Sequence, residues 1–350
     1  MTGATHHPRH RGARLAAGAA VTALLLAGCG GEVPQPAPEP AATAPQPVLD
    51  EDRIERILAD VEETVDEADA ALDAELLADR LAGPALAMRE AEYRLSAASD
   101  GERTPTPLTT NSQVEVVAAT DEWPRSLYVV SHVPEDANLP LLLVLTQEDA
   151  RSQYKLSFWT SLLPGAQTPS TARPDAGSPQ LPVDAPGLAA TPQQTVEEYA
   201  ALLSGGGNPN LFAEDPFRSG YAEMISALRA TVEVAGEVSE SYAVREGTVS
   251  AMETAEGGAL VVGVIDGRLN LSRTVEGATL EAGGDIGLLL GENSRITGAA
   301  QAHYLIPVAF AVPPAGTDEK ISVLGATQVL ANVTASEPAP EDGGGDDGEG

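Results

Sequence analysis

Between Asp50 and Leu72, apolar residues recur at every third or fourth position, and acidic residues fill most of the positions between them. This spacing predicts one long amphipathic helix with Asp50 as its N-cap. A shorter helix is expected around residues 74–81, and Pro84 is suited to begin a third helix that runs towards Leu95. The acidic residues are spread around the polar arc of the long helix, so we interpret them as a solvated surface rather than as metal ligands.

From residue 113 onward the hydrophobic period changes from 3.6 to two. Strands are predicted at 113–119, 125–133, 141–147 and 153–163. In the last strand, strict alternation puts Lys155 and Trp159 on one face, and the other face should pack under the helices. Because a tryptophan on an otherwise polar face can mark a binding surface, Trp159 and Lys155 form a candidate interaction surface. The alternative is that a second domain covers Trp159.

The same order of helices before strands then occurs a second time. Helices are predicted at 191–203, where Thr191 opens a capping box, and at 211–234. Five strands are predicted after them, at 248–254, 259–265, 268–275, 299–312 and 320–334. Asp266-Gly267 is a strong signal for a tight hairpin between two of these strands, and the loop 283–298 is long enough to have a function.

The repeated order predicts an α+β protein with two tandem domains, each with N-terminal helices packed on a curved antiparallel sheet. The first domain is expected at residues 49–164 and the second at 191–336. Between them, residues 165–190 are rich in proline, alanine, serine and glycine without an apolar period, which is typical of an interdomain linker.

The N-terminus carries a different signal. Three arginines precede an apolar run of about fourteen residues, too short to span a bilayer as a helix but suited to an export signal. Leu26, Ala27, Gly28 and Cys29 resemble the bacterial lipobox, which implies diacylglyceryl attachment at Cys29 and cleavage before it by signal peptidase II. Residues 1–28 are therefore expected to be a lipoprotein signal peptide, with Leu26, Ala27 and Gly28 recognised by the peptidase.

The predicted mature chain begins with a proline-rich tether at residues 29–48, for which the alternative is a proline-rich ligand of a partner protein. It ends in an acidic, glycine-rich tail at 337–350 that should be disordered. Without the signal peptide the chain has 17 basic and 52 acidic side chains, a formal charge of −35. A surface of that charge repels nucleic acid and anionic lipid headgroups.

Residues for catalysis or metal binding are sparse. Cys29 is the only cysteine, and the two histidines beyond the signal, His132 and His303, fall in different predicted domains. We therefore expect no metal site, no cofactor and no catalytic residue that can be named, and an enzyme is the less favoured interpretation.

The lipobox, the proline-rich tether and the repeated helix-then-strand order resemble the uncharacterised tandem-domain lipoproteins of actinobacteria. Each half, between Leu49 and Ser336, also resembles the nuclear transport factor 2-like or cystatin-like fold. That fold hosts isomerases, dehydratases, carriers and adaptors, so the resemblance implies no single activity. We expect a lipid-anchored protein on the outer face of the cell membrane that acts as a binding or scaffolding module, with an envelope protein as a possible partner. The alternative is a small-molecule carrier or an enzyme that uses a pocket in a cone-shaped domain.

Overall fold

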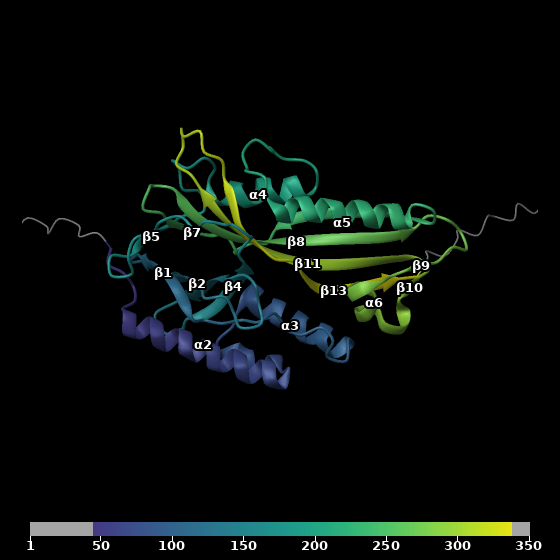
Figure 1. Cartoon of the computed structure of the whole chain (residues 1–350), viewed down its shortest axis with the longest axis horizontal. Coiled ribbons are helices and arrows are strands. Elements are labelled where there is room, and N and C mark those ends of the chain that lie inside the picture. The colour runs from purple at the N-terminus through teal and green to yellow at the C-terminus, as the bar shows by residue number, and fades with distance from the viewer. Residues whose placement is uncertain (1–44, 338–350) are drawn as a thin grey trace, which may run out of the picture. The chain divides into compact units, whose positions relative to one another are not determined.

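Two long antiparallel strands form the spine of the fold (Figure 1). β8 (Ala259–Arg273) and β11 (Ala299–Val312) pair without interruption from Ala259↔Val312 to Ser272↔Ala299. Four shorter strands pair with the outer edges of β8 and β11, two along the first half of the spine and two along the second half. These are β7 (Ser250–Glu253) and β12 (Ser322–Ala326) on the first half, and β6 (Gly236–Val244) and β13 (Val329–Ser336) on the second.

The first half of the spine belongs to a nearly closed barrel. From β7 the sheet continues through five more strands to β4. They are β5 (Ser178–Leu181), β1 (Ser112–Ala119), β2 (Arg125–Ser131), β3 (Leu141–Gln147) and β4 (Lys155–Ser161). The chain beyond β4 then meets β12, where Leu162 bridges Gly325 and the Leu163 amide donates to the Leu324 carbonyl at 2.8 Å. The structure, a computed structural model that describes residues 45–337, is therefore built on one mixed sheet of eleven strands.

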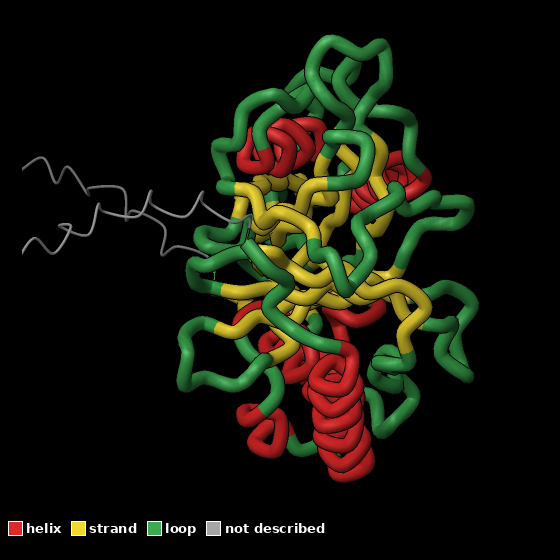
Figure 2. The backbone as a smooth tube through the Cα atoms, turned by 90° about the vertical axis from the view of Figure 1, so that its left-hand side faces the viewer, coloured by secondary structure: helices red, strands yellow, loops and turns green. Residues whose placement is uncertain are grey.

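Helices cover the barrel on two opposite sides, and the strands lie between them (Figure 2). On one side are α2 (Glu51–Ala71), the 3-10 helix η1 (Ala74–Asp79) and α3 (Gly83–Ala98); on the other are α4 (Pro192–Leu203) and α5 (Pro216–Val232). The expected caps are present: the Asp50 side chain accepts from the Arg53 amide at 2.9 Å, and Thr191 forms a capping box with Gln194. Within the described residues, no helix is long and apolar enough to cross a membrane.

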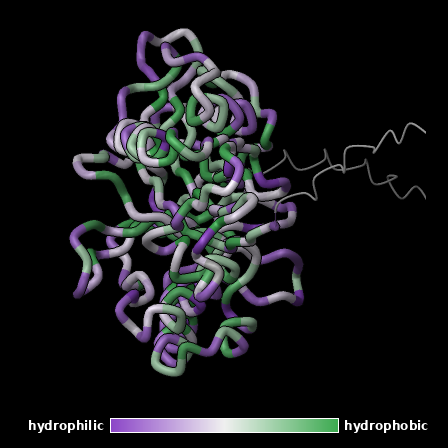
Figure 3. Tube along the Cα trace, turned by 90° about the vertical axis from the view of Figure 1, so that its right-hand side faces the viewer, coloured by the Kyte–Doolittle hydropathy of each residue, from purple (hydrophilic) through white to green (hydrophobic). Residues whose placement is uncertain are grey.

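Alternate residues of the spine serve two different cores. Val262 and Val264 face inward and pack with the sheet of β1 to β4, whereas Val261 and Ile265 face outward and pack with α4 and α5. Apolar positions accordingly gather in the middle of the fold (Figure 3). Burial of both faces explains why β8 begins as a continuous apolar run, and why the alternation of a half-exposed strand starts only further along it.

The second half of the spine also carries a small subdomain, inserted where a long functional loop was expected. It consists of β9 (Leu280–Glu281), α6 (Gly284–Leu290), the 3-10 helix η2 (Gly291–Asn293) and β10 (Arg295–Ile296). β9 and β10 pair as a separate two-stranded sheet.

The prediction of two tandem helix-on-sheet domains was wrong, and with it the expectation of two cone-shaped folds. The proline-rich segment between the two halves contains β5, which pairs in parallel with β1 and antiparallel with β7. That strand joins both halves into one sheet, so the segment is not a free linker. Pro179 lies inside this four-residue strand, opposite Ala119 of β1, so a proline in the segment does not exclude a short strand there.

The expected hairpin at Asp266-Gly267 was also wrong. Gly267 lies inside β8, opposite Tyr304 of β11 and Tyr242 of β6. A Cβ atom there would lie 3.2 Å from Ile306 Cδ1 and 3.3 Å from Tyr242 Cε1. The glycine therefore makes room for neighbouring side chains rather than for a turn. By contrast, the strands predicted at 141–147 and 299–312 are confirmed to the residue.

The predicted signal peptide, residues 29–44 of the predicted tether and all but the first residue of the acidic tail lie outside the described residues. They remain predictions. Pro47 and Val48 at the end of the tether, by contrast, lie against β1.

Candidate functional site

Of the candidate site residues predicted from the sequence, the structure describes only Lys155 and Trp159. Leu26, Ala27, Gly28 and Cys29 lie outside the described residues. Trp159 is fully buried, with 0% of its surface exposed, and Lys155 donates through Nζ to the Ala78 carbonyl at 2.6 Å. The structure therefore does not place them together on an interaction surface.

A β-bulge explains the misplacement of Trp159. β4 pairs Leu156 with Leu145 and Phe158 with Val144, so Ser157 is an extra residue in the ladder. A bulge shifts the alternation by one position. Trp159 consequently shares the face of Leu156 and packs within the core beneath α2 and α3, whereas Phe158 faces the space between the sheets.

That space contains a partly enclosed cavity of about 440 Å³, which we call the inter-sheet pocket. Its size is within the range typical of small-molecule sites. A larger hollow of about 880 Å³ near Pro47 and Arg173 is more open to solvent. We therefore take the inter-sheet pocket as the candidate site. Its lining comes from the start of α3, from β2, β3, β4, β5, β7 and β8, and from the turn before β7.

One wall of the pocket carries a row of hydroxyl groups. Ser126, Thr146 and Ser157 come from three adjacent strands, β2, β3 and β4. Thr146 Oγ1 and Ser157 Oγ lie 2.8 Å apart, and Ser157 Oγ also donates to the Val144 carbonyl at 3.1 Å. Ser126 is only 2% exposed, and its side chain lines the pocket in the same row.

One polar group of the lining, on β5, is buried and unsatisfied. The Gln180 side chain donates through Nε2 to the Pro124 carbonyl at 3.0 Å, which fixes its orientation. Its Oε1 is buried and, among residues 45–337, accepts no hydrogen bond. Gln180 thus offers the pocket a carbonyl oxygen that the described part of the chain leaves unpaired, and Ser126 adds a hydroxyl group to the same lining.

The opposite wall is apolar. Val249, Val262 and Val264 line it, and Ser250 at its edge accepts a hydrogen bond of 2.8 Å from the Tyr128 hydroxyl. Burial raises the pKa of Tyr128, so this hydroxyl remains a donor at neutral pH. The pocket therefore presents hydrogen-bonding groups on one side and a hydrocarbon surface on the other.

The N-terminus of α3 also reaches the pocket, through Ala82, Gly83 and Pro84. Ala82 stands at the N-cap and provides no side-chain cap. The positive end of the helix dipole is thus left without a carboxylate partner from its own cap residue. In the described lining, Glu148 is the only ionisable side chain, and it is exposed.

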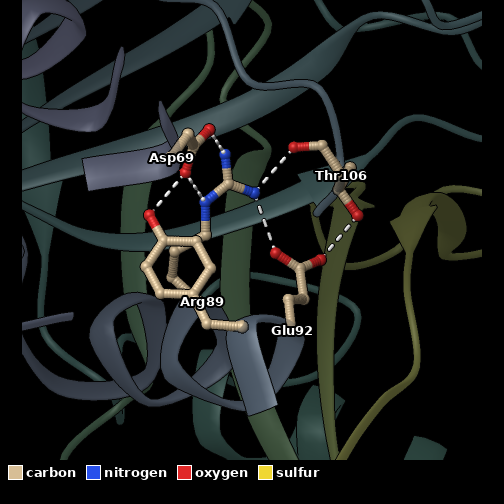
Figure 4. A network of polar contacts seen from close by, with 5 residues as sticks. Asp69, Arg89, Glu92 and Thr106 are labelled. Carbon is tan, nitrogen blue, oxygen red and sulfur yellow. Dashed lines mark hydrogen bonds and ion pairs between the residues drawn. The ribbon is translucent and has the colours of Figure 1, made fainter. Parts of the chain in front are cut away.

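A second polar cluster lies beneath α2 and α3 (Figure 4). Arg89 of α3 is fully buried and forms ion pairs with Asp69 and with Glu92, the latter at 2.8 Å. Arg89 Nη1 also donates to the Thr106 carbonyl at 2.7 Å, and the Thr106 hydroxyl donates to Glu92 at 2.6 Å. Because every member is bonded to another, we interpret this network as a structural tie between two helices and the segment after them.

Neither histidine contributes to a site of this kind. His132 is exposed at the end of β2, and His303 Nε2 lies 2.9 Å from Asp266 on the spine. Within residues 45–337, no group of three or more potential metal-ligating side chains comes together.

Comparison with families of known sequence gives one match. The family described as "Domain of unknown function (DUF8094)" matches residues 45–335, which is nearly all of the described part. Comparisons with curated proteins and with solved structures gave no match.

Proposed function

Because this chain belongs to the family described as Domain of unknown function (DUF8094), we propose its function from the site itself: it is a lipid-anchored envelope protein that binds an uncharged, amphipathic small molecule in the inter-sheet pocket. The observation that carries the proposal is the buried, unpartnered carbonyl oxygen Gln180 Oε1, on the lining of a cavity that also has the Ser126, Thr146 and Ser157 hydroxyl groups on one wall.

Binding is favoured over catalysis by the chemistry of the lining. A proton-transfer or nucleophilic mechanism needs a titratable or activated group in contact with the substrate. The described lining contains serine and threonine hydroxyls but no histidine, cysteine, lysine or arginine, and Glu148 is exposed. Since no base stands beside any of these hydroxyls, they are suited to hydrogen bonding rather than to nucleophilic attack.

The two unlike walls define the class of ligand. A molecule with one polar edge and one apolar face would direct the edge to Ser126 and Gln180 and the face to Val262 and Val264. An anion would find no cationic side chain among the described lining residues, and the formal charge of the mature chain is strongly negative. The ligand is therefore uncharged, with at least one donor for Gln180 Oε1.

Export and anchoring are the second part of the proposal and rest on the sequence. The basic N-terminus, the short apolar run and the lipobox-like Leu26, Ala27, Gly28 and Cys29 support an actinobacterial-type lipoprotein. At least two acyl chains on Cys29 would give stable attachment, which a single chain does not. The tether at 29–48 would then hold the pocket-bearing unit away from the membrane.

Native mass spectrometry of protein purified from an actinobacterial host tests the pocket. We expect a small neutral adduct that is lost on denaturation and is much reduced in the double variant Ser126→Ala, Gln180→Leu. Ser226→Ala, a matched loss of a hydroxyl on the exposed side of α5, should retain the adduct. An adduct of equal abundance in the double variant, or none in the wild type, would contradict the pocket proposal.

Anchoring is tested separately by fractionating cells that express the wild type or Cys29→Ser. The wild type should reside in the membrane fraction with the mass of a lipidated chain that begins at Cys29, and the variant should be neither cleaved nor lipidated. A soluble, unmodified wild type would contradict this part of the proposal alone.

A further inference from the structure

Beyond the barrel, β6, β8, β11 and β13 form an open four-stranded sheet, and β8, β11 and β13 are labelled in Figure 1. One face packs against α5, with Leu269, Leu271 and Ala302 in the outer core. The opposite face is accessible and lacks large apolar side chains. We call its central part the polar platform, and it consists of Ser239, Asn270, Ser272, Gln301, Thr334 and Ser336.

The strand register makes the polar platform a regular array. Asn270 lies opposite Ser239 on one side and Gln301 on the other, and Gln301 lies opposite Thr334. Directly opposed residues share a face and stand about 5 Å apart. Four hydrogen-bonding side chains therefore cross four strands in a single row. The small neighbours leave a shallow hollow of about 390 Å³ over that row.

Part of the array is fixed before any ligand arrives. Gln301 donates through Nε2 to Asn270 Oδ1 at 2.8 Å. This bond leaves the Gln301 carbonyl oxygen and the Asn270 amide group directed to solvent as an acceptor and a donor. Since both side chains are held by each other and by rigid strands, binding through them costs little side-chain entropy.

The platform is also uncharged, in a chain with 52 acidic residues. The acidic residues of this face, Glu237 and Asp266, lie at its two ends. Asp266 is paired with Arg245 at 3.0 Å. The next row after Asn270 contains Arg268, which is exposed and forms no ion pair within the described residues.

These features disfavour nucleic acids, membranes and large protein interfaces as partners of this face. A nucleic acid requires several cations for its phosphates, and a membrane surface requires cations or an apolar face. A stable protein interface has an apolar, aromatic-rich centre, whereas the centre of this face is Asn270 and Gln301. A neutral polysaccharide, by contrast, presents hydroxyl groups that both donate and accept, as the platform does. We propose that the polar platform binds a neutral glycan chain laid across β6, β8, β11 and β13.

The polar platform is separate from the inter-sheet pocket and consists of different residues, so either proposal can be contradicted without affecting the other. Because the described platform offers no aromatic ring for stacking, the affinity rests on hydrogen bonds, and a dissociation constant of about millimolar order is expected. Affinity gel electrophoresis suits such weak binding, since an acidic protein migrates well and is retarded by polysaccharide embedded in the gel.

The experiment runs the full mature chain through gels that contain dextran, galactan, arabinan or mannan. At least one of the four should retard the wild type, and the double variant Asn270→Ala, Gln301→Ala should weaken that binding about tenfold. Thr334→Asp, an acid placed on an exposed position of β13, is a second variant with the same expectation. Far-ultraviolet circular dichroism and melting temperature report whether each variant is folded.

Ser126→Ala in the pocket should be retarded like the wild type, which separates this site from the pocket. No retardation of the wild type by any of the four polysaccharides would overturn the proposal, and so would equal retardation of both folded platform variants. A dimer in size-exclusion chromatography that Thr334→Asp dissociates would assign the face to a second copy of the chain instead.

Discussion

The buried arginine between α2 and α3 gives the sharpest prediction about stability. Arg89→Met keeps much of the side-chain volume but removes the charge that Asp69 and Glu92 share. Arg89 is 0% exposed and Glu92 only 11%, so Glu92 would remain as a nearly buried carboxylate without its cation. Removal of one partner from a buried ion pair typically costs about 3–5 kcal/mol. We expect Arg89→Met to lower the free energy of unfolding by that amount.

A neighbouring ion pair provides the control. Arg80 pairs at 2.6 Å with Asp60, which belongs to α2 as Asp69 does, but the Asp60 side chain is 48% exposed. Exposed pairs contribute at most about 1 kcal/mol, so Arg80→Met should cost little. Guanidinium denaturation of the chain without residues 1–28 measures both variants. Equal losses for the two, or a loss below about 1 kcal/mol for Arg89→Met, would refute the assignment of the network as a buried structural tie.

The pH dependence of the Arg89→Met defect follows from Glu92. Burial raises the pKa of Glu92, and Arg89 partly offsets that effect. A group whose pKa is raised on folding contributes stability below its unfolded pKa and loses it as the pH rises through the folded pKa. Without Arg89 the pKa of Glu92 should rise further. The defect should therefore be largest near pH 7 and shrink as the pH falls towards the unfolded glutamate pKa of about 4.3. A defect that grows on acidification would contradict this account.

Three further predictions concern the fold. Trp159→Ala should lower the unfolding free energy by about 3–5 kcal/mol in chemical denaturation, because it empties a fully buried site. Gly267→Ala should cost about 1–3 kcal/mol in the same assay, since its Cβ would lie 3.2 Å from Ile306 Cδ1. Residues 45–164 and 191–336 expressed as separate chains should not give dispersed amide NMR spectra of folded domains, because both halves complete one sheet through β5.

Much of the secondary structure could be predicted because it is locally encoded. The long first helix carries an apolar stripe and an N-cap in its own sequence, and Leu141–Gln147 is apolar enough to be a strand in any context. β6 was missed because its apolar residues are few: Val238, Tyr242 and Val244 alternate with serine, glutamate and alanine. β5 was missed because four residues that include Pro179 form a strand only when β1 and β7 lie on either side of them.

The candidate site could be predicted far less well, for two physical reasons. Ser126, Thr146 and Ser157 form one row only after three strands pair in register, and nothing in the local sequence specifies that register. The bulge at Ser157 then reverses which face Trp159 occupies. Ser126 lies between Arg125 and the apolar run that begins at Leu127, and a lone serine in a strand does not by itself indicate a cavity.

The two proposed sites lie on one continuous face of β8. The residues on this face change from apolar to polar where the sheet of β1 to β4 no longer packs against it. Val262 and Val264 lie beneath the sheet of β1 to β4 and line the pocket, whereas Asn270 and Ser272, further along the same face, belong to the platform. Exposure to solvent explains why Asn270 and Ser272 are polar, because an open sheet face is solvated. It does not explain why they are neutral in a chain rich in acids, since glutamate or lysine would be solvated equally well. The proposed recognition of an uncharged, hydroxyl-rich ligand would account for the neutral residues at the platform.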